Sequence, residues 1–320
     1  MRAAVYKKYG SPDVVSIQKV VNPKPSAGEV LIKVHASTVN RTDTGFRSAK
    51  YFLSRLFSGL LRPKIPVLGC EFAGEVVAAG QGVRYHKVGD RVFGYDDSGF
   101  GGHAEYKVIR DDGALASIPD GMDYLEAAAL TEGSHYALNN IRAAKVKKSD
   151  VVLVYGATGA IGSAAVQLLK HFGTYVVAVV NTKNVDLIRS LGIDEVIDYQ
   201  TQDFTKTTHR FDFVFDAVGK SSFAECKPLM KPKGIYTSTE LGKRGINIWL
   251  ALTTPFGNGK KVLFHIPTID KDDVLFLRNL AHQGSFRPII DRQYALDDTV
   301  DAHRYVESGH KTGNVIISIV

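Results

Sequence analysis

Three evenly spaced glycines are the residues of this chain best suited to hold a ligand. Gly156, Gly159 and Gly162 follow the apolar run Val151–Tyr155 and open the helix-like stretch Ala160–Phe172. Such glycines let backbone amides approach a pyrophosphate, and the helix that follows presents free N–H groups and a positive dipole. The spacing is Gly-x-x-Gly-x-x-Gly rather than Gly-x-Gly-x-x-Gly, yet the strand–turn–helix context favours a dinucleotide site over an ordinary turn.

The end of the next apolar run, Tyr175–Val180, bears on the choice of cofactor. An enzyme that uses NAD usually has an acidic residue about 20 positions beyond the glycines, where it binds the ribose 2′-hydroxyl. Asn181 stands there, 19 residues after Gly162, and Lys183 follows closely. A lysine can pair with a 2′-phosphate, although it can also be a solvated residue at a helix start. The pattern predicts NADPH.

A third strand end, at Asp216, carries Ala217, Val218 and Gly219. Segments at the carboxyl edge of a parallel sheet face the ligand. A backbone role near the nicotinamide and an ordinary turn both fit this segment.

The elements around these residues change in kind near Asp123. Before it, short strands are predicted at Ala3–Tyr6, Val14–Val20, Glu29–Ala36, Gly74–Ala79 and Arg91–Gly94, which indicates a barrel-like β domain. After it, helices at Tyr124–Leu130, Ser134–Ala143, Ala160–Phe172 and Val185–Leu191 are predicted, with strands at Val151–Tyr155, Tyr175–Val180, Glu195–Ile197, Phe211–Asp216 and Gly234–Ser238. The alternation predicts a doubly wound parallel sheet. Two helices, Asp272–His282 and Leu296–Ser308, and a strand, Asn314–Ile319, complete the chain.

Bulk composition limits the classes of function. A length of 320 residues suits about two domains, and 44% hydrophobic with 23% charged residues is ordinary for a soluble globular protein. No apolar run reaches the roughly 20 residues of a membrane span, and the N-terminus lacks a signal-peptide pattern, so we expect a cytoplasmic protein. The net charge of +7 is scattered, which suits an anionic cofactor better than an obligate nucleic-acid partner. Two distant cysteines, Cys70 and Cys226, predict no structural disulfide.

One segment, Ser48–Lys64, is basic and amphipathic. We expect a helix or flap over the molecule's own cleft, and a membrane-surface helix is the alternative.

Further motifs carry a resemblance that covers nearly the whole chain. They are Gly28–Val34, Ser37–Asp43, Gly69–Val76, Val88–Val92 and Gly101–Tyr106. With the glycine turn, they make the sequence similar to the medium-chain dehydrogenase/reductase superfamily, and most similar to its zinc-independent quinone oxidoreductases. The resemblance implies a GroES-like β-barrel-type domain, residues 1–123 and 266–320, and a Rossmann NADP-binding domain, residues 124–265.

The resemblance also implies that no metal is bound. Zinc-dependent relatives place Cys, His and Cys where this chain has Asn40, Cys70 and Thr131. Catalytic zinc needs about three protein ligands in fixed geometry. Cys70 and the adjacent Glu71 cannot build that site alone, and we expect Cys70 to be a small buried residue.

The predicted catalytic residues are Asn40, Asp43 and Tyr95. Asn40 could orient the substrate or nicotinamide through its amide, whereas Asp43 is better suited to fixing its loop through backbone N–H groups. Many relatives carry a tyrosine near the substrate where this chain has Gly45. Tyr51, Tyr95 and His103 are the alternative proton donors, and the sequence does not rank them.

The resemblance adds Tyr199 and a basic residue near Asn184 as contacts of the 2′-phosphate, and places His310–Gly313 where relatives close over the cofactor. The predicted cofactor-binding residues are Thr131, Gly156, Ala157, Thr158, Gly159, Ala160, Ile161, Gly162, Asn181, Thr182, Lys183, Asn184, Tyr199, Ala217, Val218, Gly219 and Lys311.

These features predict an NADPH-dependent oxidoreductase that transfers hydride to a quinone or an α,β-unsaturated carbonyl without zinc. The alternatives are an alcohol or aldehyde reductase, and an NADPH-binding protein with a non-catalytic RNA- or partner-binding role. A homodimer is also predicted, joined through an apolar edge strand at Gly245–Leu252.

Overall fold

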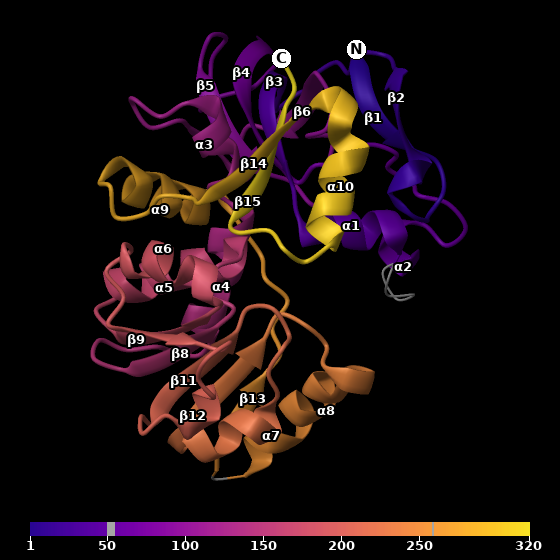
Figure 1. Ribbon diagram of the computed structural model, residues 1–320. Helices are drawn as coiled ribbons and strands as arrows, with labels where there is room; N and C mark the ends of the chain where they lie inside the picture. The colour runs from indigo at the N-terminus through magenta and orange to yellow at the C-terminus, as the bar shows by residue number, and fades with distance from the viewer. Residues whose placement is uncertain (50–54, 258) are drawn as a thin grey trace. The chain divides into compact units, whose positions relative to one another are not determined.

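The computed structural model describes residues 1–49, 55–257 and 259–320 (Figure 1). Two compact units emerge: unit 1 is Met1–Glu132 with Ile269–Val320, and unit 2 is Gly133–Thr268. The sequence places the boundaries at 123/124 and 265/266. The first unit border falls later because helix α3, Tyr124–Ala128, packs on four strands of unit 1. No helix among the described residues is long and apolar enough to cross a bilayer.

Unit 2 is built on a sheet of six parallel strands. Its strands are β8 (Val151–Tyr155), β9 (Tyr175–Val180), β10 (Glu195–Asp198), β11 (Phe211–Asp216), β12 (Met230–Ser238) and β13 (Lys261–Leu263). Their spatial order is β10-β9-β8-β11-β12-β13, so the order reverses between β8 and β11. Ligands of doubly wound sheets bind at the carboxyl ends of the strands at such a reversal.

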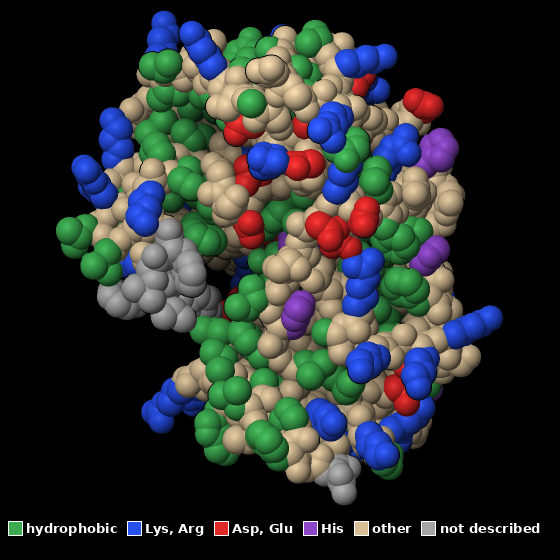
Figure 2. Space-filling view, turned by 180° about the vertical axis from the view of Figure 1, so that it is seen from behind, with side chains coloured by type: hydrophobic (Ala, Val, Ile, Leu, Met, Phe, Trp, Pro, Cys, Tyr) green, Lys and Arg blue, Asp and Glu red, His purple; other side chains and the backbone are tan. Residues whose placement is uncertain are grey.

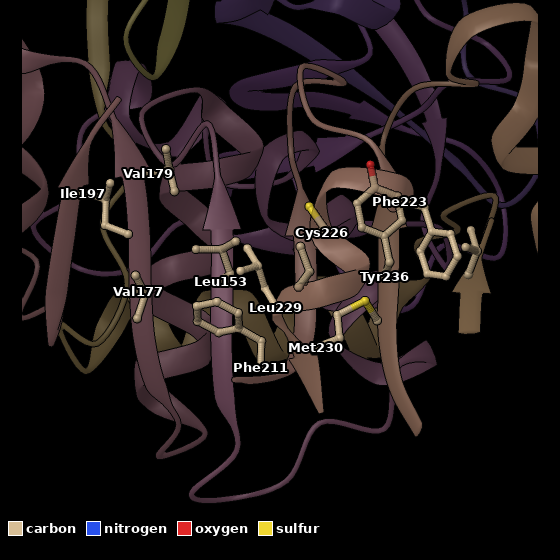
Figure 3. Close-up of a cluster of buried hydrophobic side chains, with 12 residues drawn as sticks. Leu153, Val177, Val179, Ile197, Phe211, Phe223, Cys226, Leu229, Met230 and Tyr236 are labelled. Carbon is tan, nitrogen blue, oxygen red and sulfur yellow. The ribbon is translucent and has the colours of Figure 1, made fainter. Parts of the chain in front are cut away.

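Helices cover both faces of this sheet, whose strands are apolar. Its helices are α4 (Glu132–Ala143), α5 (Ala160–His171), α6 (Val185–Arg189), α7 (Phe223–Cys226) and α8 (Ile246–Thr253). Because strand–helix–strand crossovers are right-handed, α5 and α6 lie on the face opposite to α7 and α8. Figure 3 shows one core cluster, in which Leu153, Phe211 and Tyr236 from three strands pack with Cys226 and Leu229 from the segment after β11.

Unit 1 is mainly antiparallel. Its strands are β1 (Arg2–Tyr6), β2 (Val15–Lys19), β3 (Glu29–Val39), β4 (Glu71–Ala79), β5 (Arg91–Tyr95), β6 (Tyr106–Arg110), β7 (Leu115–Ser117), β14 (Ile290–Ala295) and β15 (Asn314–Ser318). The larger sheet has the order β14-β15-β3-β4-β5-β7, with β6 also on β3, and β1 pairs with β2. The sequence did not predict β6, β7 or β14; β14 lies largely exposed with charged side chains, so it lacks the expected apolar alternation.

The helices of unit 1 are α1 (Arg41–Ser48), α2 (Arg55–Ser58), α3, α9 (Lys271–His282) and α10 (Thr299–Glu307). Arg47 of α1 is fully buried and hydrogen-bonds the carbonyl of Gly10, the carboxylate of Glu307 and the ring of His303. This one guanidinium joins α1 to the loop after β1 and to α10. The segment Ser48–Lys64 contains the end of α1 and all of α2, but residues 50–54, including Tyr51, lie outside the described part of the chain.

The expected edge strand at Gly245–Leu252 is wrong, because this run forms helix α8. Asn247 is buried and Leu250 and Ala251 pack on the core, so the inward positions recur every three or four residues as in a helix. The actual edge of the sheet is β13, on which α8 packs.

Candidate active site

The surroundings of the three glycines in this turn differ, and each explains why a side chain is absent there. Gly156 adopts φ +77°, and a Cβ on it would lie 2.5 Å from the side chain of Val218. A Cβ on Gly162 would lie 2.1 Å from the carbonyl oxygen of Gly156, so α5 packs closely on the turn. A Cβ on Gly159, the N-cap of α5, would meet nothing within 4 Å. The backbone is therefore open where an anion would approach the first N–H groups of a 12-residue helix.

Ala217, Val218 and Gly219 meet this turn at the reversal of the strand order. Val218 is the residue that a side chain on Gly156 would strike, so the segments after β8 and β11 are neighbours. The carboxylate of Asp216 accepts hydrogen bonds from the N–H groups of Val218 (3.2 Å), Gly219 (2.8 Å) and Ser221 (2.9 Å). Asp216 thus holds the loop after β11 in place, a role that the sequence did not reveal.

The ends of β9 and β10 lie side by side. Asn184 is buried, donates from its amide to Oδ1 of Asn181 at 2.7 Å and closes the turn between them. Lys183 on that turn is exposed. The backbone N–H of Tyr199 donates to the carbonyl of Val180, which fixes Tyr199 beside the turn.

A pocket of about 440 Å³ opens beside Tyr199, lined by Tyr155, Tyr199, Gln200, Thr201, Gln202, Asp203 and Phe204. The rings of Tyr155 and Tyr199 are stacked, with centroids 6.4 Å apart. Tyr155 and the loop after Tyr199 were missed from the sequence; an aromatic residue at the last position of β8 was the available signal. Asp198 was missed too, and its carboxylate accepts from the hydroxyl of Thr182 at 2.6 Å.

Charge is distributed unequally between the two units. Lys and Arg balance Asp and Glu in unit 1, so the whole net charge of +7 resides in unit 2. In the lower part of Figure 2, which shows one face of unit 2, Lys and Arg side chains outnumber carboxylates. A positive field of this kind favours an anionic ligand on unit 2.

In unit 1, the buried carboxylate of Glu71 brings Asn40 and Thr131 together. Its Oε1 accepts from the backbone N–H (2.8 Å) and hydroxyl (2.8 Å) of Thr131 and from the N–H of Glu132 (2.5 Å). Its Oε2 accepts from the hydroxyl of Thr38 (2.7 Å) and from the amide of Asn40 (2.8 Å). Both oxygens are therefore saturated by donors of the chain itself.

Asp43 lies beside this cluster, in the first turn of α1 rather than in a loop. Its carboxylate accepts from the N–H groups of Asn40 (2.9 Å) and Gly69 (2.9 Å), and the thiol of Cys70 is 3.9 Å away. Cys70 is fully buried, and burial, together with the negative charge of Asp43, raises the pKa of its thiol well above the usual value. Tyr95 ends β5 opposite Glu71 and is buried.

Two more ionisable groups of unit 1 lie close by. Glu132 is buried and accepts from the hydroxyl of Thr42 at 2.7 Å. Lys311 is partly buried and donates to the carbonyl of Gly313 at 2.5 Å. Burial lowers the pKa of Lys311 to about 8, against the opposing effect of Glu132.

Comparison with known proteins shows which families the chain resembles. Residues 26–120 match the alcohol dehydrogenase GroES-like domain family, and residues 191–317 match the zinc-binding dehydrogenase family. The chain is 31% identical to the 2-methylene-furan-3-one reductase of Solanum lycopersicum, over 99% of this chain and 79% of the relative. It is 30% identical to the chloroplastic NADPH-dependent alkenal/one oxidoreductase of Arabidopsis thaliana, with the same two coverages. The solved quinone oxidoreductase from Coxiella burnetii superposes with a TM-score of 0.88 at 27% identity, covering 100% of this chain and 99% of that one.

The chain belongs to the medium-chain dehydrogenase/reductase family. The predicted architecture, a GroES-like domain and a Rossmann domain, is confirmed, and the chain is an oxidoreductase that uses a nicotinamide cofactor. The glycine turn fits that cofactor, because the open backbone over Gly159 leaves room for its pyrophosphate.

Zinc, which the second family's description implies, does not fit this member of the family. The amide nitrogen of Asn40 and the hydroxyl of Thr131 are hydrogen-bonded to Glu71, and burial raises the pKa of the Cys70 thiol, which disfavours the thiolate. Zinc requires deprotonated ligands. Among residues 1–49, 55–257 and 259–320, no three His, Cys, Asp or Glu side chains group into a metal site.

Two alanine substitutions separate the roles of the glycines. In Gly162→Ala the new Cβ would collide with the backbone of Gly156, so we expect the free energy of unfolding to fall by about 1–3 kcal/mol. In Gly159→Ala the Cβ enters open space, so we expect stability within about 0.5 kcal/mol of wild type but NADPH binding weakened at least about tenfold. Urea unfolding and cofactor fluorescence titration measure the two effects. Equal stability of both variants would contradict this assignment.

Proposed function

We propose that the chain is a zinc-free, NADPH-dependent reductase of quinones or α,β-unsaturated carbonyls. The observation that carries this proposal is the saturation of Glu71 by Thr38, Asn40, Thr131 and Glu132. Hydrogen bonds within the chain occupy the place at which zinc-containing relatives assemble a metal. The names of the tomato and Arabidopsis relatives, a furanone reductase and an alkenal/one oxidoreductase, point to the same acceptors.

The absence of a fitting metal site bears on the class of substrate. Oxidation of a simple alcohol requires loss of its hydroxyl proton, which zinc normally assists. A quinone or enone is already electrophilic, and reduction spreads the new negative charge over several atoms. Such an acceptor requires from the protein mainly alignment and exclusion of water, while the bound nicotinamide supplies the hydride.

We propose that unit 2 binds the cofactor through Gly156–Gly162, with the 2′-phosphate near Lys183 and Tyr199 and the nicotinamide half near Ala217–Gly219. Asn181 replaces the carboxylate of NAD enzymes, and the excess positive charge of unit 2 favours the additional phosphate. Thr182 and the N–H of Gln200 (3.0 Å) engage the carboxylate of Asp198, which lies beside this turn.

Asn40, Asp43 and Tyr95 are proposed to shape the substrate site of unit 1. The amide nitrogen of Asn40 is held by Glu71 and by Thr38 (2.9 Å), which fixes the direction of the side chain. Asp43 fixes the backbone on both sides of the cluster, so it acts as a positioning residue. Thr131 and Lys311 are proposed to contact the cofactor.

The cofactor preference can be measured with 9,10-phenanthrenequinone as acceptor. We expect kcat/KM for NADPH to exceed that for NADH by roughly tenfold to a hundredfold, because charge-assisted bonds to the 2′-phosphate contribute about 1.5–3 kcal/mol. Lys183→Ala should reduce this preference, whereas Lys147→Ala, an exposed lysine before the amino end of β8 and so at the opposite edge of the sheet, should not. A wild-type preference for NADH would refute the cofactor assignment, and absence of turnover would favour the non-catalytic RNA- or partner-binding role.

The purified chain should contain no stoichiometric zinc, because Asn40, Cys70 and Thr131 are unsuited as ligands. Elemental analysis is expected to find far less than one zinc per chain, and chelators should leave quinone reduction unchanged. One tightly bound zinc, or activity lost to a chelator, would overturn this and favour an alcohol or aldehyde reductase.

We also propose a homodimer, formed by unit 2 beside β13. Trp249, Leu252 and Phe256 in and after α8 are 61%, 66% and 93% exposed, which is unusual for large apolar residues. Light scattering should give a particle heavier than the 35.0 kDa chain, and Trp249→Lys should lower its mass. A 35.0 kDa wild-type particle at micromolar concentration would exclude the dimer.

A cytoplasmic location is proposed as well. Cys70 and Cys226 are both free and buried, as suits a reducing compartment.

A further inference from the structure

One buried carboxyl oxygen of unit 1 has no hydrogen-bond partner among the described residues. Oε1 of Glu132 accepts from Thr42, but Oε2 is shielded from solvent and contacts no donor or acceptor within the described part of the chain. Leaving a buried polar group unsatisfied costs about 1–3 kcal/mol. Such a group in a native fold requires a reason, and a role in catalysis is one of the few known.

The surroundings of Glu132 favour its protonated form. Burial raises the pKa of its carboxyl group well above the usual value, and the nearby carboxylates of Asp43 and Glu71 raise it further. The hydroxyl of Thr42 opposes this shift, as does the positive charge of Lys311. The backbone N–H of Glu132 is bound to Glu71, so the carboxyl group is anchored beside Asn40 and Thr131.

We propose that Glu132 is the acid that protonates the enolate formed when this chain reduces an α,β-unsaturated ketone. The proposal rests on the proposed function and deepens it. The main geometric support is Oε2 of Glu132, which has no hydrogen-bond partner among the described residues. Glu132 follows Thr131 and shares the cluster around Glu71 with Asn40, where we place the substrate. Catalytic hydrogen bonds often form only in the substrate complex.

The step balances in atoms and charge. With hydride supplied to the β-carbon by the bound nicotinamide cofactor, the electron pair of the carbon–carbon double bond would move toward the carbonyl and give an enolate. The O–H bond of Glu132 breaks and its proton goes to the α-carbon, which leaves the saturated ketone, NADP⁺ and an ionised Glu132. A proton from water then restores the acid, and the ammonium of Lys311 stabilises the transient carboxylate.

Quinone reduction by the same chain is a suitable comparison for this proton transfer. Hydride transfer to a quinone gives a phenolate-type anion, and its oxygen exchanges protons rapidly with water. Protonation of an enolate at carbon is slower, so it benefits from a held acid, and general acids typically contribute about 10²–10⁴-fold. Loss of the acid should therefore lower enone reduction far more than quinone reduction.

The test compares Glu132→Gln with wild type on one quinone, 9,10-phenanthrenequinone, and one enone, a cyclic ketone with a methyl group on its α-carbon. We expect the ratio of enone kcat to quinone kcat to fall at least about tenfold in Glu132→Gln, and Glu132→Asp to recover part of it. In wild type, enone kcat should decline as pH rises through the raised pKa of Glu132, because only the protonated acid is active; this decline should be absent in Glu132→Gln.

Glu126→Gln is the matched control, since Glu126 forms a surface ion pair with Arg287 and should change neither rate. An equal loss of both activities in Glu132→Gln, or no loss, would overturn the proposal. If the variant does not fold, the wild-type product decides: one configuration at the α-carbon supports a held acid, and a racemic product refutes it. A wild type that reduces neither substrate would instead refute the proposed function.

Discussion

A buried carboxylate must be surrounded by donors, and in this chain Glu71 imposes that constraint on two other segments. Thr38 and Asn40 come from the end of β3 and the residue after it, and Thr131 and Glu132 come from the junction at which α4 begins. Transfer of an unpaired carboxylate from water into the protein would cost several kcal/mol, so none of these segments can shift without leaving a charge uncompensated. The substrate side of unit 1 is therefore organised around an anion that belongs to the chain itself.

This arrangement also bears on the proposal that no metal is bound. The groups near Glu71 direct N–H and O–H donors at its carboxylate, so both of its oxygens are already engaged. Asp43 accepts from two backbone N–H groups and disfavours a thiolate at Cys70. The hydrogen bonds around Glu71 thus stabilise the fold of this part of unit 1.

How far the sequence reveals the site depends on whether a residue's role is local. The glycine turn was predictable, since the requirements at Gly156 and Gly162 are set within a dozen residues, and β8, β9 and β11 have the predicted bounds. Helix α8 was not, because its exposed face is as apolar as its buried one and the pattern carries no clear period. Tyr155 and Asp198 act through residues that follow other strands, which only the sheet order reveals. The lack of a hydrogen-bond partner at Oε2 of Glu132 depends on tertiary contacts, and no pattern in the sequence indicates it.

The proposed acid follows from the same constraint that excludes zinc. A Lewis acid stabilises negative charge on a substrate oxygen because it brings positive charge; without one, the remaining electrophile is a proton. A proton stays on a carboxyl group near neutral pH only if ionisation is made unfavourable, and at Glu132 burial and the two neighbouring carboxylates have this effect. Glu71 therefore acts twice: its hydrogen bonds hold Glu132 in place, and its charge disfavours a second anion beside it. The polar groups that saturate Glu71 donate nothing to Oε2 of Glu132, so that oxygen has no hydrogen-bond partner among the described residues.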